Sequence, residues 1–566
     1  MNNFISKRVF MLLTGMLGIA VVVFVWSLMP VPAPNVVSTS QSEAEVPPLV
    51  SPIQQKTPFI VDSAVRPVVS LSEVTSGVAP TSSRPAEEYR PSRRGIDPNK
   101  PFDPIAENGA IFEGWEKPVV TLILTGRLNG YLEPCGCAGM ERMMGGLSRR
   151  ATFFQELEEK GWNPVFLDTG GISPGFTQQA KIKFLFAVNM LREMGYDAIT
   201  LGNIDLTFPA GDLLSEVTNP GRSGHLFVSS NVGLFEMNAE ILPPAKVLIR
   251  NGIRIGILGI LGDVEREEVR NDEIRFAPAD ASLKRIVPLL KSKSDFVVLL
   301  AYASIEECRK YAREYPDVDV IVSVMGTPVP PSHIEILEET GQYLATVGEK
   351  GMHCIALGIY DDDENPVRYE RVPMDSRFAF SQKILDLMAL YQDQLKRTGL
   401  EGLGIRPLKN PAQETHGTYV GSDRCESCHE ESYQIWRKSR HFKAWKSLKD
   451  STPTRTADPE CIVCHVVGWN IEHATPYQSG FLDMEKTPHL SKVGCESCHG
   501  PGSKHIEAEM GTDAALQEKL RQAVRVTMED AKKTLCITCH DLDNSPYFDF
   551  DLYWPCIEHK EEEETE

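Results

Sequence analysis

The chain has 566 residues, of which 42% are hydrophobic and 24% charged, and its formal net charge is −20. This length allows two or three domains with substantial cores. Binding to nucleic acid requires a basic surface, so the acidic balance argues against a nucleic-acid partner.

Residues 1–30 predict a membrane segment. Lys7 and Arg8 precede an apolar run at 9–29, and a run of about 20 apolar residues spans a bilayer. No convincing small-residue cleavage site follows, so an uncleaved anchor is favoured over a cleaved signal peptide. Positive residues before such a run stay in the cytoplasm. We therefore expect a single-pass inner-membrane protein with the bulk of the chain in the periplasm.

Residues 31–117 predict a disordered tether. The segment is rich in Pro, Ser, Val and Glu, as in PVPAPN and EVPPLV, and it shows no lasting period of a strand or a helix. Such a composition cannot bury enough apolar surface to fold by itself.

Residues 118–378 predict an α/β domain. Short β-rich runs such as VVTLILTG, NPVFLDTG and IRIGILGI end near Gly, Asn or Asp, and helical patterns such as AKIKFLFAVNMLREMG separate several of them. Buried strands that alternate with helices form a layered α/β sheet structure. A helical linker follows at 379–414, with one apolar face formed by Ile384, Leu385, Met388, Tyr391 and Leu395.

Residues 415–560 have a different sequence pattern, because they lack β-strand patterns and contain recurring cysteines. Eight of the 13 cysteines fall in four C-x-x-C-H motifs, each ending in a histidine. The motifs, numbered I to IV, are Cys425-Cys428-His429, Cys461-Cys464-His465, Cys495-Cys498-His499 and Cys536-Cys539-His540. This is the attachment signature of c-type haem, in which two thiols bind the porphyrin and the histidine binds the iron. We expect four covalently bound haem c groups, followed by a solvated acidic tail at 561–566.

Two other uses of these cysteines are weaker hypotheses. Paired C-x-x-C motifs can bind zinc through four thiolates, but such a site needs no histidine. An exported chain could also form disulfides. Neither explains a histidine after every pair, whereas four porphyrins would also compensate for the thin apolar composition of this region.

A six-coordinate haem needs a second axial ligand. The other histidines of this region are His416, His441, His473, His489, His505 and His559. His505 follows His499 by only six residues, so the short link would have to pass round the porphyrin edge for both to bind one iron. We therefore expect His505 to bind a different haem from His499. The residues alone favour a surface position for His416, His473 and His489.

The region from about 419 to 560 resembles the tetrahaem cytochrome c-554 family, in the segments YVGSDRCESCHEESYQIWRKSRHFKAW, ECIVCHVVGW, VGCESCHGPGSKH and LCITCHDLDNSPYFDFDLYWPCIEHK. The resemblance implies three bis-histidine haems and one haem, at His465, with an open axial position. It makes His441, His505 and His559 the distal ligands. It also implies that His505 serves the haem of motif I, His441 that of motif III and His559 that of motif IV.

The α/β region resembles the metallophosphoesterases of the periplasmic 5′-nucleotidase type, a calcineurin-like α/β sandwich. The resemblance lies in the order of strand-end motifs TGRLNGYLEPCGC, FLDTGG, TLGNIDL, VLLAYAS and VIVSVMGTP. In the active family these positions hold a dimetal site of Asp, His and Asn ligands.

This sequence departs from that pattern at nearly every metal ligand. Asn203 is retained, but the other positions hold residues of a different kind, namely Arg127, Asn129, Gly171, Ile204, Tyr302, Met325 and Thr327. Two dications need several oxygen or imidazole ligands, and a guanidinium has no lone pair to offer. We therefore expect the fold to be kept and the dimetal catalysis to be lost.

Two features near the first of these motifs stay open. Cys135 and Cys137 could bind a metal, form a redox pair or bond each other. The segment GGLSRR after them could bind an anion or simply begin a helix.

The sequence as a whole predicts an electron-transfer protein with four c-type haems, whose α/β domain is a docking or sensing module with an unknown ligand. A redox partner protein or a quinol-linked membrane complex would exchange electrons with it. A haem enzyme that acts on a small nitrogen or oxygen species at the His465 haem is one alternative. An active metal-dependent phosphoester hydrolase is the other.

Overall fold

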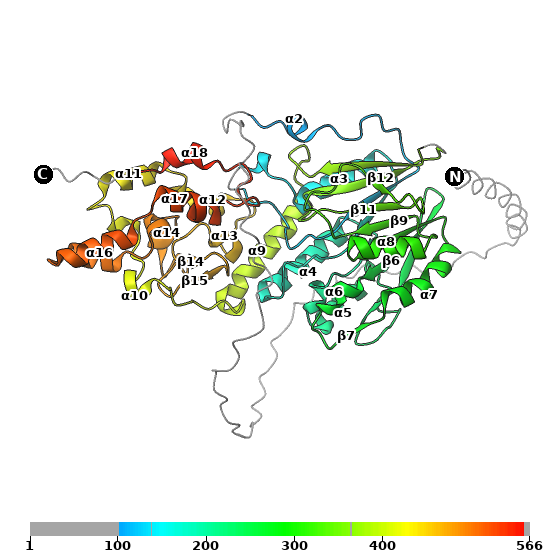
Figure 1. Cartoon of the computed structure of the whole chain (residues 1–566), viewed down its shortest axis with the longest axis horizontal. Coiled ribbons are helices and arrows are strands. Elements are labelled where there is room, and N and C mark those ends of the chain that lie inside the picture. The colour runs from blue at the N-terminus through cyan, green and yellow to red at the C-terminus, as the bar shows by residue number, and fades with distance from the viewer. Residues whose placement is uncertain (1–100, 137–138, 363–364, 560–566) are drawn as a thin grey trace, which may run out of the picture. The chain divides into compact units, whose positions relative to one another are not determined.

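The computed structural model describes residues 101–136, 139–362 and 365–559 (Figure 1). The described residues group into one compact unit by their contacts. An α/β part precedes a part in which short helices carry the four C-x-x-C-H motifs.

The α/β part is built on two sheets. The five-stranded sheet has the order β13 (Val367–Pro373), β12 (His353–Ile359), β1 (Val120–Thr125), β2 (Pro164–Asp168) and β3 (Ala198–Ile199). The six-stranded sheet has the order β10 (Glu335–Ile336), β11 (Tyr343–Thr346), β9 (Val320–Ser323), β8 (Phe296–Tyr302), β6 (Ile253–Leu261) and β5 (Ala245–Arg250). Strands β1, β2 and β3 run parallel, as do β6, β8, β9 and β11. A small antiparallel pair, β4 (Val232–Leu234) and β7 (Ile274–Phe276), lies outside both sheets.

Alternation along the strands explains the layers. In β8, Val298 and Leu300 belong to the core cluster shared with the five-stranded sheet, whereas Val297 and Leu299 belong to a second cluster. Successive side chains of a strand point to opposite faces, so the six-stranded sheet is buried on both sides. Helices α7 (Ala279–Lys291) and α8 (Ile305–Glu314) supply the second cluster and cover the outer face (Figure 1). The predicted α/β sandwich is therefore present.

Helices also pack on the five-stranded sheet. The core that this sheet shares takes side chains from α3 (Leu147–Glu159), α4 (Gln178–Glu193) and α9 (Gln382–Gly402). Ile384, Met388, Tyr391 and Leu395 of α9 are buried there, as the apolar face read from the sequence predicts, whereas Leu385 is only half-buried. Shorter helices α2 (Pro104–Asn108), α5 (Ala210–Thr218) and α6 (Asp263–Glu267) complete this part.

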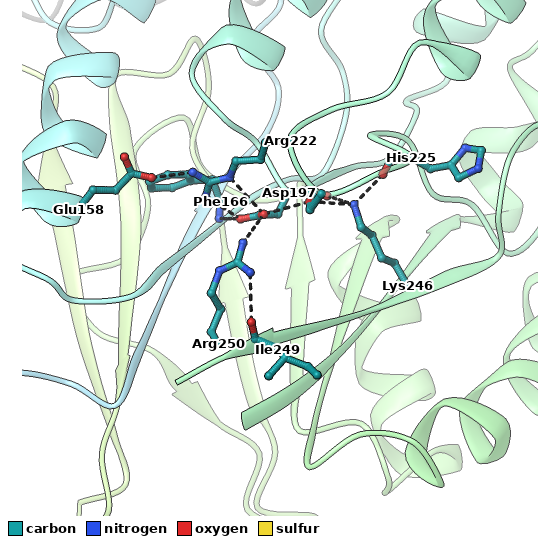
Figure 2. Close-up of polar contacts among 9 residues, drawn as sticks. Glu158, Phe166, Asp197, Arg222, His225, Lys246, Ile249 and Arg250 are labelled. Carbon is teal, nitrogen blue, oxygen red and sulfur yellow. Dashed lines mark hydrogen bonds and ion pairs between the residues drawn. The ribbon is translucent and has the colours of Figure 1, made fainter. Parts of the chain in front are cut away.

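A cluster of ion pairs and hydrogen bonds around the buried Asp197 joins the two sheets (Figure 2). Asp197, which precedes β3, accepts hydrogen bonds from the backbone N–H of Phe166, from Arg222 Nη2 at 3.0 Å and from Arg250 Nη2 at 2.6 Å. Lys246 donates to the Asp197 carbonyl at 2.7 Å. Arg250 and Lys246 lie on β5 of the other sheet. Asp197, with its buried and paired carboxylate, therefore links the two sheets at the end opposite the strand-end motifs.

The region after α9 has little regular structure. Its helices are α10 (Gln413–His416), α11 (Glu430–Lys438), α12 (Ala444–Asp450), α13 (Pro459–Ile462), α14 (Cys495–His499), α15 (Ser503–Glu509), α16 (Ala514–Val524), α17 (Met528–Asp530) and α18 (Phe550–Tyr553). Strands β14 (Trp469–Asn470) and β15 (Thr475–Pro476) form a two-residue pairing. The apolar cluster here is small, with Trp469, Phe481 and Leu490 among its buried members. The sequence-based expectation of a thin apolar core is met.

The localisation predicted from the sequence is contradicted. Within the three described ranges, no helix combines the length and the apolar character needed to cross a bilayer, against the predicted single-pass inner-membrane protein. Helix α9 has 21 residues, but charged residues such as Asp386 and Lys396 lie exposed on the side away from its buried apolar face. The apolar run at 9–29, on which the prediction rested, lies outside the described residues.

The predicted disorder does not extend over residues 101–117. Phe112 and Trp115 form an aromatic cluster with Trp162, in which the two indole rings stack with centroids 5.9 Å apart. Asn108 Nδ2 also donates to Asp375 at 2.8 Å. These few aromatic residues attach the segment to the α/β core. The average composition of the segment is otherwise polar and does not indicate this attachment.

Candidate functional site

Each C-x-x-C-H motif lies in a tight helical turn. In motifs I and IV the histidine backbone N–H donates to the carbonyl of the first cysteine, at 3.0 Å for both His429 and His540. Motif III is the short helix α14, and Cys461 of motif II lies in α13. One helical turn brings two thiols and an imidazole close together, as attachment of haem c requires.

Three of the motif histidines lie opposite a distal histidine. The ring centroids are 6.2 Å apart for His429 and His505, 6.2 Å for His441 and His540, and 5.8 Å for His499 and His559. Two imidazoles that bind one metal from opposite faces, with metal–nitrogen bonds of about 2 Å, have ring centres roughly 6 Å apart. The residues therefore fit three bis-histidine haem sites.

The distal partners agree with the sequence-based pairing at one site and differ at two. His505 lies opposite His429, and not opposite His499, as expected. The prediction that His441 serves motif III and His559 motif IV is wrong, because His441 lies opposite His540 and His559 opposite His499. The physical reason is the chain path: His441 begins η5 (His441–Lys443), and this turn brings its ring to motif IV.

Hydrogen bonds at the second ring nitrogen orient these imidazoles. Nδ1 of His499 lies 2.7 Å from the Val524 carbonyl, and Nδ1 of His465 lies 2.7 Å from the Ala444 carbonyl. Nδ1 of His540 lies 3.0 Å from Ser545 Oγ. A ring that donates from Nδ1 keeps its Nε2 lone pair for a metal. Rings oriented in this way suit an iron ligand. His465, which is 7% exposed, is among them.

Glu496, inside motif III, explains how His505 reaches motif I. Its carboxylate accepts hydrogen bonds from the backbone N–H groups of Val420, Gly421 and Gly502, at 2.7 to 3.0 Å. Residues 420 and 421 lead into motif I, and Gly502 leads into α15, which carries His505. Burial raises the pKa of Glu496, although these N–H donors lower it. No sequence signal singled out this glutamate.

The four motifs adjoin in the spatial order I, III, IV, II. The neighbouring Cys495 thiol is the main cause of a raised pKa at the Cys425 thiol, so motifs I and III adjoin. The Cys539 thiol likewise is the main cause of a raised pKa at the Cys464 thiol, so motifs II and IV adjoin. Cys498 of motif III lies within electrostatic range of Cys536 and Cys539 of motif IV. The binding sites therefore form one continuous row.

The alternative uses of the cysteines find no support in the described part of the chain. No two of the twelve described cysteines form a disulfide with each other. Residues 101–136, 139–362 and 365–559 also contain no group of three or more Cys, His, Asp or Glu residues arranged to hold a metal ion. Cys137 lies outside the described residues.

Motif II contacts the α/β part through buried polar groups. Asp458 is 5% exposed and accepts hydrogen bonds from Gln179 of α4 at 2.8 Å and from Gln392 of α9 at 3.0 Å. It also caps α13, which carries Cys461. Arg455 donates to the carbonyl of Pro134, next to Cys135. Burial raises the pKa of the Cys461 thiol, and electrostatic repulsion by Asp458 and Cys135 raises it further. No sequence pattern indicated this interface.

Several strand-end residues of the α/β part gather at one edge. Tyr302 ends β8, and Gly171 and Gly202 follow β2 and β3. A Cβ added to Gly202 would lie 2.5 Å from Tyr302 Cε2, and one added to Gly171 would lie 3.0 Å from it. The phenol ring thus packs directly against both loops.

The polar groups at this edge are already bound to the protein. Arg127 pairs with Glu349 at 2.6 Å and donates to the Val324 carbonyl at 3.2 Å. The buried Asp205 carboxylate accepts from the N–H groups of Gly171, Ser173 and Gly202 at 2.8 to 2.9 Å. Burial raises the pKa of Asp205 to about 6.

Comparisons with known proteins match the two parts separately. Residues 424–500 match the family model "Cytochrome c554 and c-prime". Cytochrome c-554 of Nitrosomonas europaea is 29% identical over 150 residues, which cover 23% of this chain and 60% of that protein. The 5′-nucleotidase of Mus musculus is 26% identical over 242 residues, covering 38% of this chain and 40% of that one. A solved 5′-nucleotidase precursor of Thermus thermophilus aligns with 22% identity and a TM-score of 0.42, over 49% of this chain and 59% of that one.

Both resemblances stated from the sequence are thereby confirmed. The matches indicate a c-type cytochrome domain joined to a 5′-nucleotidase-like domain, and a cytochrome domain of this family implies covalently bound haem c. The chain spans at most 60% of the length of these relatives.

Proposed function

We propose that the chain is an electron-transfer protein that binds four haem c groups. The observation that carries the proposal is the set of three histidine pairs, each at the ring separation of a bis-histidine site. Bound haem c would supply one-electron redox chemistry. The remaining motif, motif II, has the same cysteine spacing, and its His465 is oriented by the Ala444 carbonyl.

The row of motifs supports transfer between sites. Motif I adjoins motif III, motif III adjoins motif IV, and motif IV adjoins motif II, through the cysteine contacts described above. The protein's contribution would be to fix ligands, burial and hydrogen bonds, which tune reduction potentials. A redox partner protein would exchange electrons with the row.

Paramagnetic resonance of the oxidised full-length protein tests the ligation. We expect low-spin ferric signals from at least three haems, because three sites offer two imidazoles each. An oxidised protein dominated by high-spin signals would contradict the assignment of the distal histidines.

We also propose that the 5′-nucleotidase-like domain does not hydrolyse phosphoesters. The Tyr302 ring packs against Gly171 and Gly202, and the Asp205 carboxylate already holds three N–H groups. A dimetal centre needs room and several oxygen or imidazole ligands at this edge. The purified protein should be inactive on nucleoside monophosphates and aryl phosphates with added manganese, cobalt or zinc. Metal-dependent turnover of either substrate by the wild-type protein would contradict this proposal.

A further inference from the structure

The cytochrome part carries a compact basic patch, although the whole chain has a formal net charge of −20. Six basic residues lie between 437 and 449, no acidic residue lies among them, and all six are exposed. The patch consists of Arg437, Lys438, Arg440, Lys443, Lys446 and Lys449. So many like charges on an acidic protein repel one another and cost stability.

Aromatic rings contact one cation of the patch and one cation beside it. Arg437 lies over the ring of Phe442 with its Cζ 5.4 Å from the centroid. Lys492, from the segment before motif III, lies over the same ring at 4.1 Å and over Trp436 at 5.5 Å. Cation–π contacts of this kind fix the positions of otherwise mobile charged side chains. These contacts hold one cation of the patch, Arg437, and the adjoining Lys492.

A hollow of about 350 Å³ lies within the patch. Phe442, Trp445 and Ser491 line it together with Lys443, Lys446, Lys449, Asp450 and Lys492. Lys446 also pairs with Asp450 inside this surface. The hollow gives a partner both an apolar floor and a rim of positive charge, as protein interfaces commonly do.

The same segment holds two of the candidate haem sites. His441 lies within the patch sequence, and its ring is 6.2 Å from that of His540 in motif IV. The Ala444 carbonyl accepts from His465 of motif II at 2.7 Å. The basic surface thus covers the end of the row formed by motifs IV and II.

We propose that this basic patch is the docking surface for an acidic electron-transfer protein, which would exchange electrons at the motif II and IV end. The inference rests on the proposed function. Complementary charge steers a partner to one orientation and raises the association rate. A partner with an acidic surface round its redox centre would place that centre next to His441 and His465.

Charge reversal tests the docking surface on the full-length holoprotein. The variant Lys443→Glu/Lys446→Glu/Lys449→Glu removes the rim of the hollow. The matched control Lys284→Glu/Arg285→Glu/Lys293→Glu makes the same change in net charge with three exposed residues of α7 and the turn after it. The probe is a plant-type ferredoxin, a small acidic iron–sulfur protein.

Two readouts are expected to agree. At about 0.01 M salt, where the Debye length is about 30 Å, the patch variant should bind oxidised ferredoxin about tenfold more weakly by calorimetry. Its haems should also be reduced about tenfold more slowly by reduced ferredoxin in stopped flow. At about 1 M salt, where the Debye length is about 3 Å, both differences should vanish. The control should stay within about twofold of the wild type.

The failure of docking and the failure of the proposed function give different results. Equal affinities and rates for the patch variant and the α7 control, in proteins with full haem absorbance, would overturn the docking surface alone. A chain without haem absorbance would remove the proposed function itself. Loss of binding to phosphatidylglycerol–phosphatidylcholine vesicles, with ferredoxin binding unchanged, would overturn the protein partner in favour of an anionic membrane surface.

Discussion

The imidazole rings of His429 and His505 lie with their centroids 6.2 Å apart and their planes at 24°. The two residues are far apart in sequence, and His505 lies only six residues after the histidine of a different motif. One short segment, motif III with the helix after it, therefore serves two sites: His499 faces His559, and His505 faces His429. Shared segments of this kind keep neighbouring haem sites close together.

Removal of a distal histidine should free one axial position without loss of the haem. We expect His505→Gly and His441→Gly each to convert one low-spin haem to high spin in the oxidised protein, because the attachment cysteines and the proximal histidine remain. Resonance spectra of the holoproteins measure the change, and added imidazole should restore the low-spin signal. His473→Gly, at an exposed histidine, is the control and should leave the spectrum unchanged. A normal spectrum for His505→Gly would disprove its role as a ligand.

Glu496 should act on motif I although it belongs to motif III. Glu496→Gln replaces one of the two accepting oxygens by an NH2 group, which cannot accept from the backbone N–H groups that this oxygen holds, so we expect a loss of about 1–3 kcal/mol in stability. A displaced α15 should also raise the high-spin fraction, and imidazole should reverse it. Glu426→Gln changes the same position in the identical pentapeptide of motif I, where the glutamate is exposed. Equal behaviour of the two variants would show that Glu496 does not position His505.

Asp458 should couple the two parts of the chain. Asp458→Ala leaves Gln179 and Gln392 without their buried acceptor, and a buried polar group without its partner costs about 1–3 kcal/mol. Scanning calorimetry should then resolve separate transitions for the α/β and cytochrome parts where the wild type shows coupled melting. Asp513→Ala removes an exposed helix cap at the start of α16 and controls for capping alone. Coincident transitions in the Asp458 variant would argue against coupling by this residue.

Asp205 should give the α/β part a specific pH dependence. Its pKa is about 6 in the folded chain, against about 3.9 in an unfolded chain. The folded state thus favours the protonated acid, and the stability that this supplies is complete below about pH 4 and is lost as the pH rises to about 6. Relative to Asp205→Asn, the wild type should lose about 2–3 kcal/mol of unfolding free energy across this window. Urea titrations at several pH values measure it, with the exposed Asp272→Asn as the control. A constant difference between wild type and Asp205→Asn would refute the assignment.

Local patterns were enough to predict the strands and the attachment motifs. The run VVTLILTG contains β1, and IRIGILGI lies in β6. Buried strands need consecutive apolar residues, and this requirement does not depend on the rest of the fold. The cysteine spacing of motif I is likewise a property of one helical turn.

Pairings across the chain were only partly predictable. The short link between His499 and His505 disfavours one haem bound by both. This predicts that His505 serves a different haem from His499. No local sequence pattern distinguishes motif III from motif IV as the partner of His441. A region with few strands and short helices has no periodic pattern that indicates which segments meet. The contact of Asp458 with Gln179 and Gln392 depends on three segments that meet only in the folded chain.

The central claim is that this chain binds four haem c groups covalently. Intact mass of the purified protein, combined with the pyridine haemochrome spectrum, counts them directly. The account predicts four haems per chain with a c-type haemochrome, and loss of one haem when both cysteines of any one motif are replaced by alanine. Fewer than four haems in the fully matured protein, or haem that is released by acid extraction, would contradict it.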